Sequence, residues 1–216
     1  VIPEVKVGDR FRDITGAVGY SFGNYEIVAL ETLERVRTKV KPETTNLKPK
    51  KDKVTVASYN VLNLSPLSED DGQRDKLADQ ITNNLRSPDV VALQEIQDNN
   101  GTTDNGETDA TETLQALVDA IAAAGGPVYA FFDVAPADGS SGGIPGGNIR
   151  NAYLYNPDRV SLVEFESLTP DVLTDFGVSN PAAFTGTRNP LLATFEFRGG
   201  EFTVINNHLT SRFGST

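Results

Sequence analysis

The stretch Asp89–Ile96, DVVALQEI, places an unbroken apolar run directly before a glutamine and a glutamate. The run Val90–Leu93 follows Ser87–Pro88, where a proline interrupts regular secondary structure. It predicts a short strand that is covered on both faces. Glu95 then stands at the mouth of this strand, where a carboxylate is held rigidly and meets little bulk water. Such a position suits a hard divalent cation, which takes oxygen ligands and often keeps only one or two carboxylates besides water and substrate phosphate. The alternative is that Glu95 merely caps the strand or pairs with a surface arginine.

A second predicted strand also ends in a polar side chain. Residues 54–60, VTVASYN, alternate between apolar and polar residues as a half-buried strand does. At its end, the amide of Asn60 can orient a carboxylate or a phosphate oxygen, because it carries both donor hydrogens and an acceptor oxygen. Asn60 is therefore a candidate site residue beside Glu95.

The composition limits the class of protein. The chain has 216 residues, no Cys and no Met, and it carries a formal net charge of −11. Without cysteine there is no disulfide framework and no thiol chemistry. No apolar run approaches the ~20 residues that span a bilayer, so the sequence contains no candidate membrane span. The acidic balance argues against nucleic-acid binding through a broad basic face, but it allows an enzyme that meets phosphate through a metal and one or two arginines.

Three regions of different character follow one another along the chain. Residues 1–35 contain short alternating pieces broken by glycine, with a turn at Gly23–Asn24, and we interpret them as the end of a small β-barrel or sandwich module. Residues 36–52 are rich in Lys, Pro and Thr, which predicts a solvated linker, with a nucleic-acid-binding tail as the alternative. Residues 53–216 form the main domain. Because the chain does not begin with Met, we expect its start to be a processed or trimmed end.

The main domain contains two predicted helices around an acidic segment. One helix carries an apolar face at Leu77, Ile81 and Leu85, and the other at 114–121. The acidic segment 98–112, DNNGTTDNGETDATE, contains no Lys or Arg and allows two interpretations. One is a Ca²⁺ loop, although the spacing departs from that of an EF-hand. The other is a solvated loop that ends in a capping box formed by the residues Asp109 and Glu112.

Later segments contain candidate phosphate-binding groups. The glycine-rich segment 139–147 could cradle a phosphate with its backbone N–H groups, but no Walker-type lysine follows, and composition alone indicates a mobile loop. Arg188 precedes a strand at 191–197, which a two-residue turn at Gly199–Gly200 connects to the next strand. Taken alone, Arg188 would form a surface ion pair, whereas a planar bidentate donor also suits phosphate.

His208 is the only histidine of the chain, and it follows a predicted strand as Glu95 does. A lone histidine is usually structural or exposed. A histidine at a strand end beside other polar groups is also suited to proton transfer, because its pKa lies near neutral pH. The residues by themselves leave both interpretations open.

Together, several separated segments resemble the endonuclease/exonuclease/phosphatase superfamily, which includes pancreatic deoxyribonuclease, abasic-site endonucleases, bacterial sphingomyelinases and inositol polyphosphate phosphatases. The resemblance covers residues 53–216, and residues 1–35 resemble segments that precede the catalytic domain in secreted bacterial nucleases of this superfamily. The segments that carry it are VASYNVLNL at 56–64, PDVVALQEI at 88–96, GGNIRNAYLYNPDRV at 146–160, the "R.P" at Arg188, and NNHLTS at 206–211.

The resemblance implies an α/β fold in which this chain forms half of a four-layer sandwich, with two packed β-sheets and outer helices. It also implies phosphoester hydrolysis by metal-activated water, with Mg²⁺ or Mn²⁺ as the cofactor and Ca²⁺ as an alternative. Four of the implied site residues should have side-chain tips within roughly 10 Å of a common point, the reach of a metal plus one phosphate. These four are Asn60, Glu95, Arg188 and His208.

The implied roles fall into three groups. The catalytic residues would be His208, Asn60 and Glu95, and the metal would be bound by Glu95 and Asn60. The substrate phosphate would be bound by Arg188, Asn148, Arg150 and Asn207, with Asn148 and Arg150 near the rim of the active site.

The sequence departs from the family pattern in one respect. The family carries a "GD.N" motif and a terminal "DH" pair, and this chain contains neither in the corresponding place. We therefore expect these motifs in a second polypeptide packed on this chain or in residues outside it, and we expect the chain alone to be inactive.

Three functions follow from these observations. The first is that of an extracellular bacterial nuclease that cleaves DNA or RNA, with nucleic acid as its partner and no membrane span. The second is that of a phosphatase or phosphodiesterase of the same fold, acting on a lipid or small phosphate ester. The third is that of a non-catalytic remnant or binding module.

Overall fold

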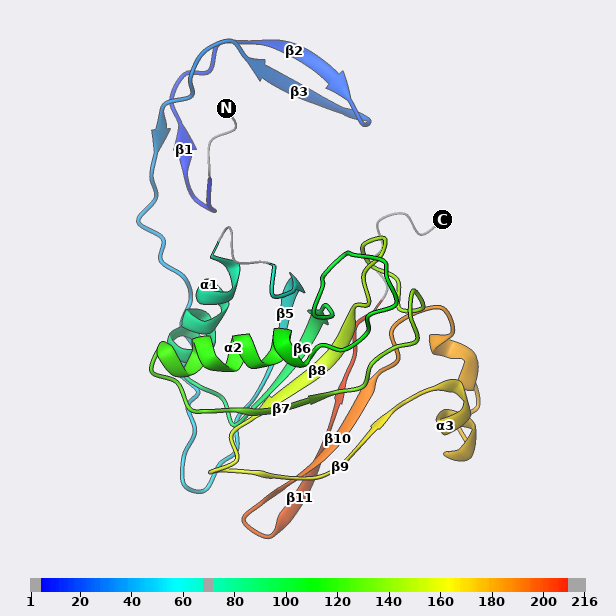
Figure 1. Cartoon of the computed structure of the whole chain (residues 1–216). Helices are drawn as coiled ribbons and strands as arrows, with labels where there is room; N and C mark the ends of the chain where they lie inside the picture. The colour runs from blue at the N-terminus through cyan, green and yellow to red at the C-terminus, as the bar shows by residue number, and fades with distance from the viewer. Residues whose placement is uncertain (1–4, 68–71, 210–216) are drawn as a thin grey trace. The chain divides into compact units, whose positions relative to one another are not determined.

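The computed structural model describes residues 5–67 and 72–209, and the chain divides into two compact units, Val1–Glu43 and Thr44–Thr216 (Figure 1). The boundary falls within the segment expected as a linker, 36–52. Residues 44–52 of this segment belong to the larger unit, where the Thr45 N–H donates to the Asn84 carbonyl at 2.9 Å. None of the helices among the described residues has the length and apolar character needed to cross a membrane.

The smaller unit consists of two antiparallel strand pairs. Strand β1 (Arg10–Phe11) pairs with β4 (Arg35–Val36), and β2 (Gly16–Ser21) pairs with β3 (Asn24–Ala29). The β2–β3 turn is Phe22–Gly23, one residue earlier than expected, and both residues have positive φ, 47° and 79°. Two such residues are typical of the two-residue hairpin turns whose twist matches that of the strands.

The larger unit contains two sheets. The order of the first is β5-β6-β8-β7, and that of the second is β11-β10-β9. Strands β5 and β6 are parallel, and all other neighbouring pairs are antiparallel. The strands are β5 (Val56–Leu64), β6 (Val90–Ile96), β7 (Ala130–Asp133), β8 (Arg150–Tyr155), β9 (Ser161–Ser167), β10 (Leu191–Phe197) and β11 (Gly200–Asn206).

The strand β6 is covered on both faces, as its continuous apolar sequence predicts. Val91 and Leu93 pack against α1 and α2, while Val90 and Ala92 pack with residues of β10, among them Phe195. Because side chains alternate along a strand, one apolar run supplies both cores. The two sheets therefore pack face to face through β6 and β8, with α1 and α2 on the outer side of the first sheet (Figure 1).

Helix α1 (Gln73–Asp79) continues into a π-helical turn (Gln80–Asn84), and α2 (Thr111–Ala123) follows the acidic segment. The predicted faces of both helices are buried in the core beneath the first sheet. The remaining helices are the short α3 (Pro170–Asp175) and a 3₁₀ turn (Pro181–Phe184). The expected fold class, a mixed α/β domain with packed sheets and outer helices, is confirmed.

The start of α2 differs from the predicted capping box. The N-cap is Ala110, and the capping oxygen comes from Asn99, whose Oδ1 accepts from the N–H groups of Glu112 at 2.9 Å and Thr113 at 3.3 Å. The carboxylate of Asp109 instead accepts from the Thr111 hydroxyl at 2.8 Å. The prediction was wrong because the capping side chain lies far back in the sequence, at the other end of the acidic segment.

The β10–β11 hairpin is also displaced by one residue from the prediction. Its two-residue turn is Arg198–Gly199, with φ values of 57° and 79°, and Gly200 already belongs to β11. The hairpin brings the segment after β11, which contains His208, to the same end of the molecule as the end of β6.

Candidate active site

The parallel pair β5–β6 loses its regular register where its polar residues lie. Asn60 pairs with Gln94, but the next pair is Leu64 with Ile96, so three residues of β5 face Glu95 alone. Against β8, the register shifts between Leu93 and Ile96. Glu95 is therefore at a β-bulge, a feature that re-aims a side chain and often lies beside active sites.

The backbone at this bulge is strained. Leu62, Asn63 and Glu95 all have positive φ, at 54°, 54° and 66°. Left-handed backbone in residues other than glycine costs about 1–3 kcal/mol each and persists only where the surroundings impose it. Three such residues on two adjacent strands indicate that the orientation of Glu95 is imposed by the fold.

The bulge brings three of the expected site residues together. The Asn60 Nδ2 donates to Glu95 Oε1 at 2.7 Å, and His208 Nε2 lies 3.3 Å from the same oxygen. The other side of the Asn60 amide is also fixed, because its Oδ1 accepts from the Leu62 N–H at 2.9 Å. The side chains of Glu95 and His208 are 17% and 15% exposed, so the cluster is sheltered but accessible.

Arg188 is the fourth member of this cluster. Its Nη2 donates to the Leu209 carbonyl at 3.1 Å, beside His208. Burial lowers the pKa of the His208 imidazole, and the positive charge of Arg188 lowers it further, while Glu95 acts in the opposite direction. The net effect is a pKa below the ordinary value, which favours the neutral form of His208 at pH 7.

Two buried nitrogens of this cluster have no hydrogen-bond partner within the described part of the chain, namely Nδ1 of His208 and Nε of Arg188. Buried polar atoms of folded proteins are nearly always paired, and exceptions call for a specific explanation. A bound anion would supply the missing acceptor for Arg188. With the Nε2 proton directed at Glu95, the lone pair of His208 is on Nδ1 and is free to accept a proton.

Asn206 and Gln94 form the floor of the site, and we did not single out either one from the sequence. Asn206 is 2% exposed, and its Nδ2 donates to the carbonyls of Leu93 at 2.7 Å and Ala152 at 3.1 Å. Its Oδ1 accepts from Gln94 Nε2 at 2.6 Å. Asn206 thereby joins the end of β11, and the histidine that follows, to the strand that carries Glu95.

The neighbouring Asn207, expected to bind phosphate, is exposed, and within residues 5–67 and 72–209 its side chain makes only a long 3.4 Å contact from Nδ2 to the Ile205 carbonyl. Both asparagines belong to the same NNHL motif, and the motif gave no way to distinguish them. Strand alternation is the available signal, because adjacent residues at a strand end point to opposite faces.

The structure places Asn148 and Arg150 in a separate cluster. Asn148 is 1% exposed, and its Nδ2 donates to the Asp98 carboxylate at 3.0 Å and to the Glu107 carbonyl at 2.8 Å. Arg150 is 3% exposed and pairs with Asp133 at 3.0 Å. These contacts tie the acidic segment to β8, so the phosphate-binding role of both residues stays a prediction without support from their contacts.

Comparison with known proteins gives a family for most of the larger unit. The model of the "Endonuclease/Exonuclease/phosphatase family" matches residues 57–209. The chain belongs to this family. A domain of unknown function, DUF8508, matches residues 1–40. None of the curated proteins compared with the chain matches it.

Solved structures of family proteins are also similar to the chain. A family protein from Leptotrichia buccalis has 16% identity and a TM-score of 0.47, over 76% of this chain and 56% of that one. The human Nocturnin catalytic domain with bound sulfate has 19% identity and a TM-score of 0.45, over 74% and 52%. D. rerio TDP2 complexed with a single-strand DNA product has 21% identity and a TM-score of 0.41, over 71% of this chain and 45% of that one. The chain thus spans about half the length of these proteins.

Enzymes of the endonuclease/exonuclease/phosphatase family hydrolyse phosphoesters and generally depend on a divalent metal. Among residues 5–67 and 72–209, no group of three His, Cys, Asp or Glu side chains is arranged to hold a metal ion. Oε1 of Glu95 takes both contacts from Asn60 and His208, which leaves Oε2 for a cation. Because Mg²⁺ commonly uses one or two carboxylates and keeps waters and phosphate oxygens, Glu95 fits as one carboxylate of such a site. Asn60, expected as a second ligand, orients Glu95 in this arrangement.

Proposed function

We propose that this chain carries the phosphate-binding half of the active site of a metal-dependent phosphodiester hydrolase, an extracellular bacterial nuclease that cleaves DNA or RNA. The observation that carries the proposal is the strained bulge that turns Glu95 toward Asn60 and His208. A strained backbone that positions a sheltered carboxylate beside a neutral histidine is typical of a catalytic centre.

Each side chain has a distinct role in this proposal. Glu95 holds Mg²⁺ or Mn²⁺, which when bound neutralises phosphate charge and acidifies water. Asn60 keeps the Glu95 carboxylate in place. Arg188 donates to the phosphate oxygens and stabilises the charge that develops on them. His208 accepts a proton at Nδ1, as its neutral form allows.

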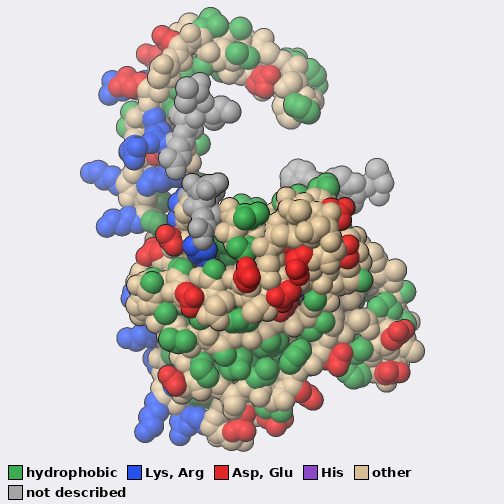
Figure 2. Space-filling model, viewed as in Figure 1, with side chains coloured by type: hydrophobic (Ala, Val, Ile, Leu, Met, Phe, Trp, Pro, Cys, Tyr) green, Lys and Arg blue, Asp and Glu red, His purple; other side chains and the backbone are tan. Residues whose placement is uncertain are grey.

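The preference for a nucleic acid over a small ester rests on a groove beside β5. The chain is acidic overall, and Asp and Glu are dispersed over the face of the larger unit that carries α2 (Figure 2). The groove, however, is lined by Lys48, Lys50 and Lys53 and extends to Ser58, two residues before Asn60 on the same face of the strand. Several lysines along one groove suit a substrate with several phosphates in a row.

The family's "GD.N" and "DH" motifs would complete this site. We propose that they come from a second polypeptide packed on this chain or from residues outside it. The extracellular location is likewise proposed, from the resemblance of residues 1–35 to the segments that precede secreted nucleases.

The test is turnover by the full-length protein with Mg²⁺, Mn²⁺ or Ca²⁺ on single-stranded DNA, RNA, a phospholipid and bis(4-nitrophenyl) phosphate. We expect cleavage of a nucleic acid, and we expect His208→Ala to lower it by about 10²–10⁴-fold. Cleavage of the lipid or the small ester alone would support the phosphatase or phosphodiesterase. No turnover of any substrate with any of the three metals would support the non-catalytic binding module.

A further inference from the structure

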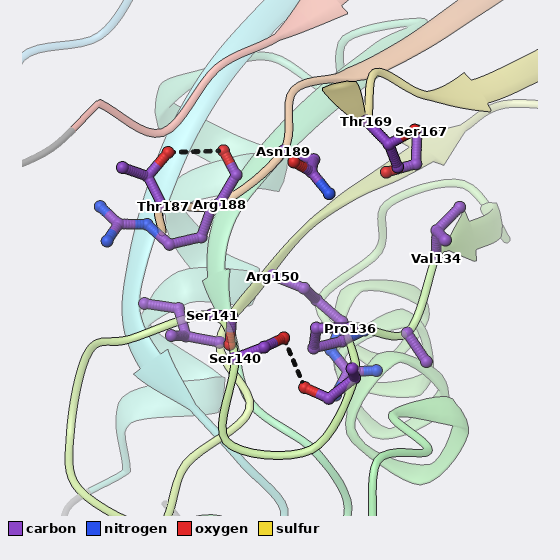
Figure 3. Close-up of a pocket in the computed structure, with 13 residues that line it drawn as sticks. Val134, Pro136, Ser140, Ser141, Arg150, Ser167, Thr169, Thr187, Arg188 and Asn189 are labelled. Atoms are coloured by element: carbon purple, nitrogen blue, oxygen red, sulfur yellow. Dashed lines mark hydrogen bonds between the residues drawn. The ribbon is translucent and has the colours of Figure 1, made fainter. Parts of the chain in front are cut away.

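A cavity of about 330 Å³ lies on the side of Arg188 that faces the 134–141 loop (Figure 3). Its wall combines this loop with Ile149 and Arg150, the end of β9, and the residues Thr187–Asn189. Glu95 and His208 do not line it, and Arg188 is the residue that it shares with the candidate active site. None of the described residues that line the wall is Asp or Glu.

Most polar groups of the wall already have partners inside the protein. The Ser140 hydroxyl donates to the Ala137 carbonyl at 2.6 Å, and the Thr187 hydroxyl donates to the Phe184 carbonyl at 3.1 Å. Arg150 is paired with Asp133. These groups shape the cavity without needing a ligand.

Ser141 and Arg188 are different. Ser141 is 4% exposed, and its Oγ has no hydrogen-bond partner within the described residues. The Arg188 Nε is also buried and has no partner among the described residues, and its Nη1 lies 3.8 Å from the place that a Cβ would take on Gly142, the residue after Ser141. The Ser141 hydroxyl and the Arg188 Nε both lack an acceptor, and the described residues of the wall include no carboxylate, which together indicate an anionic ligand.

The opposite wall has another character. It consists of Val134, Ala135, Pro136 and Ala137, with Ile149 beside them. A pocket near 300 Å³ is at the small end of the range for small-molecule sites, and it combines an apolar wall with a few polar groups as such sites do. Inorganic phosphate alone would leave the apolar wall uncovered.

We propose that this cavity binds the nucleotide residue next to the phosphate that is cleaved. Its own phosphate contacts Ser141 and Arg188, and its sugar and base cover the Val134–Ala137 wall. This inference rests on the proposed function, because it assigns the cavity to a neighbouring unit of the same substrate. Arg188 would then contact two successive phosphates, one in each site.

The cavity can be tested by binding, without any turnover. Isothermal titration calorimetry of the chain in EDTA would compare thymidine 5′-monophosphate, inorganic phosphate and thymidine. We expect thymidine 5′-monophosphate to bind more tightly than either fragment, since it alone reaches both walls. Ser141→Ala should weaken this binding about tenfold, as expected for the loss of a hydrogen bond to a charged group.

Two further variants sharpen the test. Ala135→Phe should abolish binding by filling the cavity, and Ser161→Ala, an exposed serine of β9, should leave it unchanged. Because binding is measured in EDTA, a failure of the proposed metal role does not affect the result. The inference is wrong if thymidine 5′-monophosphate does not bind at millimolar concentration, or if Ser141→Ala and Ala135→Phe both bind it as the original chain does.

Discussion

Two polar clusters near strand ends both come from segments that resemble family motifs. They differ in whether their polar groups have hydrogen-bond partners within the protein. In the cluster of Asn148 and Arg150, the amide and the guanidinium are directed at acceptors of the protein itself. In the cluster of Glu95 and His208, two buried nitrogens have no partner in the described part of the chain, and the backbone is strained. A buried cluster whose hydrogen-bonding groups all have partners in the protein stabilises the fold. A cluster in which some of these groups lack partners is available to a ligand. The difference separates structural residues from candidate catalytic residues within one set of motifs.

The largest expected effect concerns the carboxylate of Glu95, in the cluster of Glu95 and His208. Glu95→Gln keeps the shape and the contact with Asn60 but removes the charge that would hold a cation. We expect turnover of an oligonucleotide by the full-length protein to fall by orders of magnitude. Glu164→Gln, an exposed glutamate of β9, is the matched control and should keep its turnover. Near-normal turnover by Glu95→Gln would remove this residue from the mechanism.

A pair of arginine variants compares the two clusters directly. Arg150→Met leaves Asp133 without its buried partner and should lower the free energy of unfolding by about 3–5 kcal/mol. Arg188→Met removes one hydrogen bond, to the Leu209 carbonyl, and should cost only about 1 kcal/mol while weakening phosphate binding. Urea denaturation monitored by circular dichroism measures both. Equal losses of stability would erase the distinction between the clusters.

The adjacent asparagines of the NNHL motif provide a smaller contrast. Asn206→Ala removes the amide that joins β11 to β6 and β8, and it leaves buried groups unpaired, at a cost of about 1–3 kcal/mol. Asn207→Ala changes an exposed side chain and should shift stability by less than about 0.5 kcal/mol. Thermal unfolding of the two variants, measured side by side, should place Asn206→Ala well below Asn207→Ala. The opposite order would contradict the assignment of Asn206 to the floor of the site.

The smallest expected effect concerns the cap of α2. Asn99→Ala removes the oxygen that accepts from the N–H groups of Glu112 and Thr113, and such a loss typically costs about 1 kcal/mol. Chemical denaturation is sufficient to detect it. If Asp109→Ala lowered stability while Asn99→Ala did not, the capping box expected from the sequence would be right after all.

The sequence predicts the parts of this molecule that depend on neighbouring residues. The apolar run of β6, the helix faces and the hairpins all follow from local periodicity and turn residues, and both hairpin turns were predicted to within one residue. The strand ends beside Glu95 and His208 could be located in the same way, whereas Asn60, expected at a strand end, lies within β5. These features depend on short-range rules, which a single sequence contains.

The remaining features depend on contacts between distant segments. The Asn99 cap, the pairing of Arg150 with Asp133 and the bond from Asn206 to Leu93 each join residues that are well separated along the chain. No local pattern distinguishes Arg150, which pairs with Asp133, from Arg188, whose Nε has no partner among the described residues. The bulge at Glu95 is equally hidden, because its sequence is that of an ordinary strand.

The most direct measurement of the central claim is the anomalous diffraction of Mn²⁺ in crystals of the protein grown with this metal. The account predicts a single strong anomalous peak within about 2.5 Å of Glu95 Oε2, the distance of a direct metal–oxygen bond. It also predicts no peak at the carboxylates of Asp98 and Asp138, which accept hydrogen bonds from Asn148 in the cluster of Asn148 and Arg150. A peak at Asp98 and Asp138, with none at Glu95, would contradict the account.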